Sequence, residues 1–160
     1  MRRKELIFMD INEIFTLYKN STCNSVDDTF KISEKNIPKK VLALQITLGN
    51  LATLSNCCEF IKSNEFTSNT SILNEYLSCL NFIFSIGLDI GIDNLNFSIS
   101  DSTAPIYDQF LDVYVDINDF INFRTEDQFY TLLESFFTIG KSLNISISDI
   151  CDMYNLKSKK

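Results

Sequence analysis

The chain has 160 residues, 45% of them hydrophobic and 22% charged, with four glycines and two prolines. This is the composition of a globular protein, and it excludes disordered and fibrous classes. The formal net charge of −7 argues against binding to nucleic acid, because counterion release from phosphates needs clustered Lys and Arg. Few glycines and prolines favour long helices. The prediction is one all-α domain over residues 1–160, a bundle of about six helices.

The cysteines and the missing histidines restrict the chemistry. Five cysteines, at positions 23, 57, 58, 79 and 151, make an odd number without CxxC spacing, and the chain has no His. We therefore expect reduced thiols in a cytoplasmic protein rather than disulfides, a zinc site or an activated nucleophile. The basic start MRRKE is followed by acidic residues that interrupt any signal-peptide core, so no secretion signal is expected.

The first predicted helices cover residues 10–20 and residues 38 to about 61, the second opened by Pro38. The second helix contains an uncharged run, VLALQITLGNLATLSNCC, which is about as long as a membrane span. Six polar side chains interrupt this run too often for a helix that faces lipid. The run is predicted to be a buried helix of the bundle, without membrane contact.

The second half of the chain predicts a loop over 62–71 and four more helices. The first of these, over 72–92, carries leucines and Phe84 at helical spacing, with Gly87 and Gly91 near its end as candidate caps. The next begins after Pro105 and runs to residue 123. The last two cover 125–144, with Thr125 as N-cap, and 146–157, with Ser146 or Ser148 as N-cap.

Catalytic motifs are scarce. The chain has no His, no Gly-rich phosphate loop, no GxSxG and no Walker motif. Asp112, Asp116 and Asp119 have the spacing that places them on one helix face, where they could hold a divalent cation. A solvated acidic stripe is the more common reason for such spacing, and it is the favoured interpretation here.

Three stretches nevertheless resemble the dimeric all-α dUTPases. LALQITLGNLATLSNCCEFIK is similar to the family's first signature, approximately LALxVELGELANExxxFKFWS. ILNEYLSCLNFIFSIGLDIGI is similar to the second, approximately LxEYxDxLHFxLSLGLxLG. FYTLLESFFTIGKSLNISISDICDMYNLK resembles the closing helices, approximately FxxLxxLxxxLGxxLGxSxEEIxxAYxxKN. The stretches occur in the family's order, so the resemblance implies the family's helical fold.

The resemblance also implies an activity and a metal site. The family hydrolyses dUTP or dUDP to dUMP with Mg²⁺, which is held by an ExxE on one helix and an ExxD on a later one. These four acids correspond to Thr47, Asn50, Glu75 and Ser78. Only Glu75 keeps a carboxylate, so it is the one candidate metal ligand. Neutral oxygens cannot replace the lost charge beside a polyphosphate.

The nucleotide positions implied by the resemblance have changed as well. Tyr18 stands where the family has the Gln that reads uracil, and Phe60 alone survives from the aromatic FKFW segment. Tyr154 and Lys157 match the closing AYxxKN, but the Asn is Ser158 and the chain stops at Lys160, before the family's NxxRQ tail. Tyr18, Phe60, Tyr154 and Lys157 are therefore candidate vestiges of a nucleotide site.

The combined losses predict a catalytically degenerate homologue without a cofactor. Phage-encoded members of the family bind a transcriptional repressor of a mobile element, so the resemblance implies action through an unidentified protein partner, together with homodimerisation. The alternative is a nucleoside triphosphate pyrophosphatase with a divergent site, in which Mg²⁺ would be held by Glu75 and one of the aspartates on 112, 116 or 119.

Overall fold

The computed structural model describes residues 2–23, 36–61 and 67–159, with residues 2–10 and 23 described as backbone alone. The described residues form six helices and no strand, which confirms the all-α prediction. The helices are α1 (Arg2–Cys23), α2 (Ile37–Leu54), α3 (Asn69–Asp89), α4 (Ile106–Phe123), α5 (Glu126–Ser142) and α6 (Ile147–Ser158).

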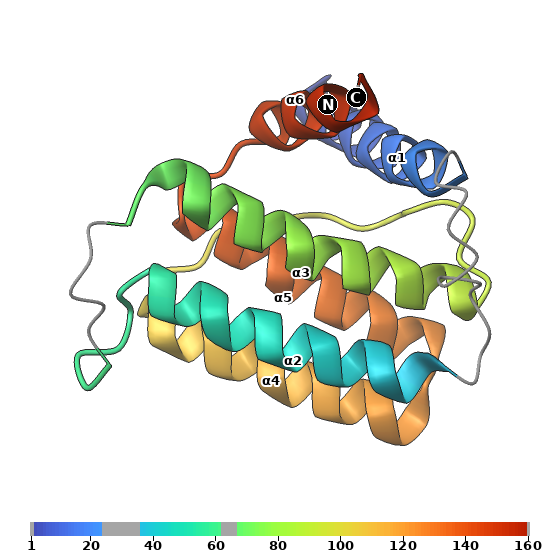
Figure 1. Cartoon of the computed structure of the whole chain (residues 1–160). Helices are drawn as coiled ribbons and strands as arrows, with labels where there is room; N and C mark the ends of the chain where they lie inside the picture. Colours follow the sequence, from blue (N-terminus) through green and yellow to red (C-terminus); the bar gives the residue numbers. More distant parts are fainter. Residues whose placement is uncertain (1, 24–35, 62–66, 160) are drawn as a thin grey trace.

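Helices α2 to α5 make a bundle, and α1 and α6 lie together across one side of it (Figure 1). Within the bundle α2 packs on α3 and α4, and α5 packs on α3 and α4. Helix α1 contacts the bundle through α3. It also holds the segment that follows α3, because the Asn12 side chain donates to the Leu95 carbonyl oxygen and accepts from the Leu95 amide. Segments from both ends of the sequence therefore form one layer over α3.

Helix α3 is the central element, because nine of its residues are buried. By length and composition alone α3 could cross a membrane, but the core helix of a soluble protein can have the same length and composition. Half of its most apolar 18-residue stretch is buried inside the protein. Tyr76 of α3 stacks on Phe136 of α5 with ring centroids 4.5 Å apart. Gly140 of α5 lets the two helices approach closely beside this ring, since a Cβ there would lie 2.5 Å from the Tyr76 hydroxyl.

Several predicted helix ends are confirmed. Thr125 caps α5 by accepting from the Gln128 amide, and Ser146, rather than Ser148, caps α6 in a reciprocal capping box with Asp149. Gly91 follows the end of α3 with a φ of +89°, the left-handed conformation that glycine adopts most easily, whereas Gly87 lies within the helix.

Other helix boundaries differ from prediction. The second helix was expected to run to about residue 61, but α2 ends at Leu54. The reason is local: the Ser55 amide closes the last turn on Leu51, and Asn56 then turns left-handed with a φ of 53°. Helix α1 begins at Arg2 rather than at residue 10, and α3 begins at Asn69 after the N-cap Ser68, inside the predicted loop.

Candidate functional site

The four metal positions implied by the family lie on two neighbouring helices, Thr47 and Asn50 on α2 and Glu75 and Ser78 on α3. The two hydroxyls turn back to their own helices. Thr47 Oγ1 lies 2.9 Å from the Ala43 carbonyl oxygen, and Ser78 Oγ lies 3.1 Å from that of Asn74. Asn50 is exposed and Glu75 is half-buried. The four positions thus supply one carboxylate, one exposed amide and two hydroxyls that already have backbone partners.

Cys79 lies between the two halves of this set. It is fully buried on α3, where Thr47 hydrogen-bonds to it and Glu75 acts on it electrostatically. Burial is the main cause that raises the pKa of the Cys79 thiol to about 12; the charge of Glu75 raises it further, and the Thr47 hydroxyl partly opposes the shift. At neutral pH the sulfur is therefore a protonated thiol, a poor metal ligand and a poor nucleophile.

These donors do not fit a magnesium cluster. Mg²⁺ requires octahedral oxygen ligation, and in phosphate chemistry it is held by anionic carboxylates that offset the charge of the metal and substrate. Glu75 alone is anionic here, and the described residues contain no group of three His, Cys, Asp or Glu side chains that could hold a metal. The four positions therefore lie on two packed helices, α2 and α3, with a single carboxylate among them.

The state of Cys79 predicts a selective alkylation pattern. With iodoacetamide at pH 8, Cys79 should react at least about 100-fold more slowly than unfolded cysteine, because a pKa three units higher leaves far less thiolate and the sulfur is buried. Cys57 and Cys58, which are half-exposed after α2, should react first. Peptide mass spectrometry against time measures both rates. Equal modification of Cys79 and Cys58 in the folded protein would contradict the described environment.

Two of the four candidate nucleotide residues come together beneath the α1–α6 layer. Tyr18 of α1 and Tyr154 of α6 are both buried. Burial is the main cause that raises the pKa of the Tyr154 phenol, and the Tyr18 phenol raises it further. The Tyr154 hydroxyl donates to Asn81 Oδ1 of α3 over 2.5 Å, while the Tyr18 ring packs on Phe84 with centroids 5.5 Å apart. Burial raises the pKa of both phenols above the ordinary value of a tyrosine, so both stay protonated at neutral pH. Both rings fill the space between α3 and the layer formed by α1 and α6.

The partners of these tyrosines form a polar stripe on α3. Asn81, Ser85 and Asp89 recur one helical turn apart, facing Tyr154, Tyr18 and the start of α2. Ser85 hydrogen-bonds to Tyr18 and lowers its pKa, whereas the charge of Asp89 raises it. Asn81 and Ser85 thus each have a hydrogen-bond partner in the α1–α6 layer, whereas Asp89 pairs with α2.

Sequence reasoning missed the buried ion pair at the end of this stripe. Lys40 Nζ of α2 lies 2.6 Å from Asp89 Oδ2, with the two side chains 7% and 0% exposed. Asp89 Oδ1 is buried and has no hydrogen-bond partner among the described residues. A signal was present: Lys40 falls on the apolar stripe of α2 with Ile37 and Leu44, where a lysine requires a partner.

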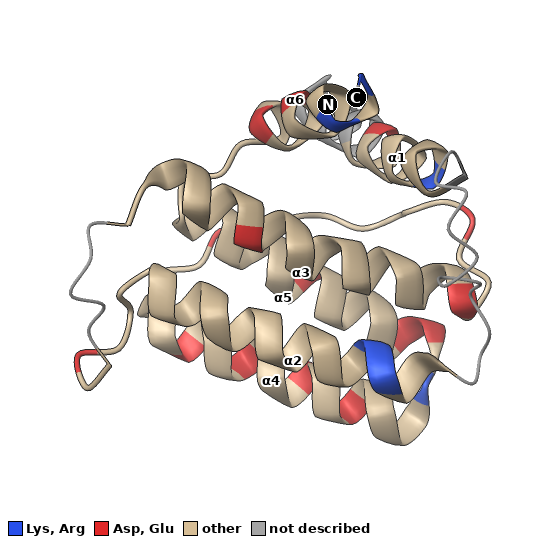
Figure 2. Ribbon diagram, in the orientation of Figure 1, with Lys and Arg blue, Asp and Glu red and all other residues tan. Residues whose placement is uncertain are grey.

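The remaining candidates lie outside these clusters. Phe60 follows α2 and is 98% exposed, so its ring does not pack with the two tyrosines, and Lys157 is exposed on α6. Asp112, Asp116 and Asp119 recur at helical spacing on α4, along which Figure 2 shows a row of acidic residues. Burial raises the pKa of Asp116, a Ser135 hydrogen bond lowers it, and the charges of Asp112 and Asp119 raise it. They are not a metal-binding group in the described structure.

The described residues thus form an all-α protein whose candidate metal positions lie on two packed helices, α2 and α3. A family profile described as dUTPase matches residues 10–160. The chain therefore belongs to this family of all-α, dimeric dUTPases. Neither a curated protein nor a solved structure matches it.

Proposed function

We propose that the chain is a catalytically degenerate member of the dUTPase family that acts by contact with other proteins. The observation that carries this proposal is the single carboxylate among Thr47, Asn50, Glu75 and Ser78. Electrostatic stabilisation of developing charge is usually the largest catalytic term, and loss of one preorganised group commonly costs about 10²–10³ in rate. Loss of three anionic ligands removes the basis for metal-assisted hydrolysis.

The buried tyrosines support the same proposal from a second subsite. Tyr18 and Tyr154 fill the seam between α3 and the α1–α6 layer, and their hydroxyls are satisfied by Ser85 and Asn81. A nucleoside entering there would have to displace two packed rings and break their hydrogen bonds. Tyr18, which stands where the family has Gln, and the retained Tyr154 therefore stabilise a closed protein core rather than a ligand pocket.

The proposal includes homodimerisation, a cytoplasmic location and a protein partner whose identity is open. The family is dimeric, which supports a dimer of this chain. The protein surface rather than the emptied site would then carry the function, as expected of a regulator or decoy.

Thermal unfolding with dUTP and Mg²⁺ tests whether the site still binds. A ligand present at about 100 times its Kd stabilises the native state by about 2.7 kcal/mol, which corresponds to several degrees of Tm. We expect 1 mM dUTP to give the same Tm with Mg²⁺ as with EDTA. The Thr47→Glu/Asn50→Glu/Ser78→Asp variant, which restores the acids, is the matched comparison and should acquire a Mg²⁺-dependent shift. A Mg²⁺-dependent shift of several degrees in the wild type would contradict the proposal.

A further inference from the structure

Helix α4 carries an apolar row and an acidic row side by side, because a hydrophobic residue followed by an aspartate recurs every four residues, close to one helical turn. The pairs are Tyr107 with Asp108, Leu111 with Asp112, and Val115 with Asp116. The three hydrophobic side chains are 51%, 60% and 55% exposed. Single exposed hydrophobic residues are common, whereas a row of them marks an interaction surface. We call these six residues the paired rows of α4.

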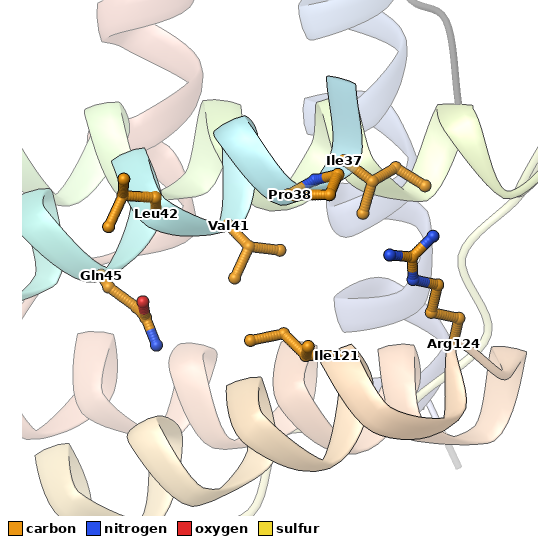
Figure 3. Close-up of a pocket in the computed structure, with 7 residues that line it drawn as sticks. All are labelled: Ile37, Pro38, Val41, Leu42, Gln45, Ile121 and Arg124. Atoms are coloured by element: carbon orange, nitrogen blue, oxygen red, sulfur yellow. The ribbon is translucent and has the colours of Figure 1, made fainter. Parts of the chain in front are cut away.

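An apolar recess lies between the start of α2 and the end of α4. Leu42 lines it on one side, and Ile121 and Arg124 line it on the other (Figure 3). Its volume is about 140 Å³, close to that of a cavity that accepts benzene, so it can take one large apolar side chain. The two helices stay in contact further along, where the Tyr114 hydroxyl donates to the Gln45 carbonyl oxygen over 2.9 Å. The apolar surface of α4 therefore continues onto α2 and is hollowed at one end.

The acidic row is not neutralised within the described part of the chain, where the ion pairs use other acids. Asp119 adds a fourth carboxylate three residues after Asp116. Burial raises the pKa of Asp116, a Ser135 hydrogen bond partly offsets the shift, and the charges of Asp112 and Asp119 raise the pKa further. Asp116 Oδ2 is buried and has no hydrogen-bond partner among the described residues. The carboxylates therefore repel one another, and cationic groups placed along the row would relieve that repulsion.

The charge of this surface distinguishes between possible occupants. Anionic lipids and nucleic acids would be repelled by the carboxylates. A second copy that packed its α4 against this one would bring two acidic rows together, and like charges juxtaposed across an interface are strongly unfavourable. A helix with an apolar residue every four positions and Lys or Arg beside it matches both rows, because two packed helices have the same rise per residue. The pattern therefore favours a basic, amphipathic helix.

We propose that the paired rows of α4 bind a basic amphipathic helix of a partner protein, whose apolar side chains lie along Tyr107, Leu111 and Val115. The Lys or Arg side chains of the partner lie along the acidic row, and one large apolar side chain enters the recess beside Ile121. The net charge of −7 speeds encounter with a basic partner, since long-range attraction acts mainly on the association rate. The inference rests on the proposed function and deepens it by naming the chemistry of the partner.

Fluorescence anisotropy with a synthetic peptide measures this binding. The probe is a fluorescein-labelled helix of about 18 residues, long enough to span α4, in which Leu-Lys pairs recur every four residues and Ala and Gln fill the other positions. It should bind the full chain at least about 10-fold more tightly than a scrambled peptide of the same composition. A peptide with Leu-Glu pairs should bind at least about 10-fold more weakly as well. Raising NaCl from about 50 to about 500 mM should weaken binding of the Leu-Lys peptide, because the acids are solvent-accessible.

Two matched pairs of variants locate the peptide on the protein. Asp112→Lys and Leu111→Ser should each weaken binding of the Leu-Lys peptide at least about 10-fold. Their controls lie on α6, where Asp152 is also an exposed aspartate and Leu156 is 60% exposed, like Leu111. Asp152→Lys and Leu156→Ser should leave the Kd within about twofold of the wild type. Circular dichroism checks that all four variants remain helical.

Failure of this inference and failure of the proposed function give different results. Equal binding of the Leu-Lys and scrambled peptides, or equal effects of the α4 and α6 variants, would overturn the α4 surface and leave the loss of catalysis intact. A change of oligomeric state in Asp112→Lys or Leu111→Ser, measured by sedimentation velocity without peptide, would overturn it too, because the rows would then be an interface between copies. Metal-dependent hydrolysis of dUTP would instead overturn the proposed function and would leave peptide binding unchanged.

Discussion

Replacing Lys40 with methionine is expected to lower the free energy of unfolding by about 3–5 kcal/mol, the usual cost of breaking a buried ion pair from one side. Methionine occupies a similar volume, so the loss comes from the carboxylate that remains. The Asp89 side chain is 0% exposed, and its Oδ1 already lacks a partner among the described residues. Without the ammonium group, both oxygens would be buried without compensation. Urea unfolding followed by circular dichroism measures the change.

Two further variants separate the charge effect from packing. Lys40→Met/Asp89→Leu should return to within about 1 kcal/mol of the wild type, because replacing both members of a buried pair by apolar groups is often neutral. Lys141→Met removes the exposed pair with Asp101, whose side chains are 45% and 88% exposed, and should cost at most about 1 kcal/mol. If Lys40→Met costs no more than Lys141→Met, the buried pair does not have the environment described.

Replacing Gly140 with alanine should destabilise the protein by about 1–3 kcal/mol, the usual cost of overpacking a core. In an exposed helix interior the same change would stabilise by about 1 kcal/mol, so the close packing reverses the expected sign. A Cβ at position 140 would lie 2.5 Å from the Tyr76 hydroxyl oxygen and 2.8 Å from the ring carbon that bears it. The Tyr76 ring is fully buried and stacked on Phe136, so it has little room to move.

Gly49 provides the comparison for this prediction. A Cβ at position 49 would meet the Tyr114 hydroxyl at 3.2 Å, a tight but adjustable contact, so Gly49→Ala should change stability by less than about 1 kcal/mol. Tyr76→Phe should relieve part of the Gly140→Ala penalty, because it removes the nearest atom. A Gly140→Ala variant at least as stable as the wild type would show that α3 and α5 are not in this close contact.

The sequence predicts the helices well where short-range chemistry determines them. Thr125 and Ser146 are N-caps because their hydroxyls accept backbone amides three residues ahead, an arrangement visible in the residue order. Gly91 likewise marks the end of α3. The end of α2 was missed because Asn56, which is neither Gly nor Pro, adopts the left-handed conformation there.

The sequence allowed us to predict which residues belong to the candidate site, but not which side chains contact each other there. The order of motifs indicated that Thr47 and Glu75 would come from helices of one seam, but not that the buried Cys79 thiol lies between them. The pairing of Tyr18 with Ser85 and of Lys40 with Asp89 depends on how α1 and α2 pack against α3. Such long-range partners follow from tertiary geometry, which periodicity does not specify.

The most direct test of the proposed loss of catalysis is hydrolysis of dUTP and dUDP with Mg²⁺ or Mn²⁺, followed by release of pyrophosphate or phosphate. Enzymes typically turn over at about 1–10³ s⁻¹. We expect no release above a protein-free blank, because Glu75 is the one carboxylate among the four metal positions. Turnover above about 0.1 s⁻¹, still slow on that scale, would contradict the assignment if it is metal-dependent and disappears in Glu75→Gln.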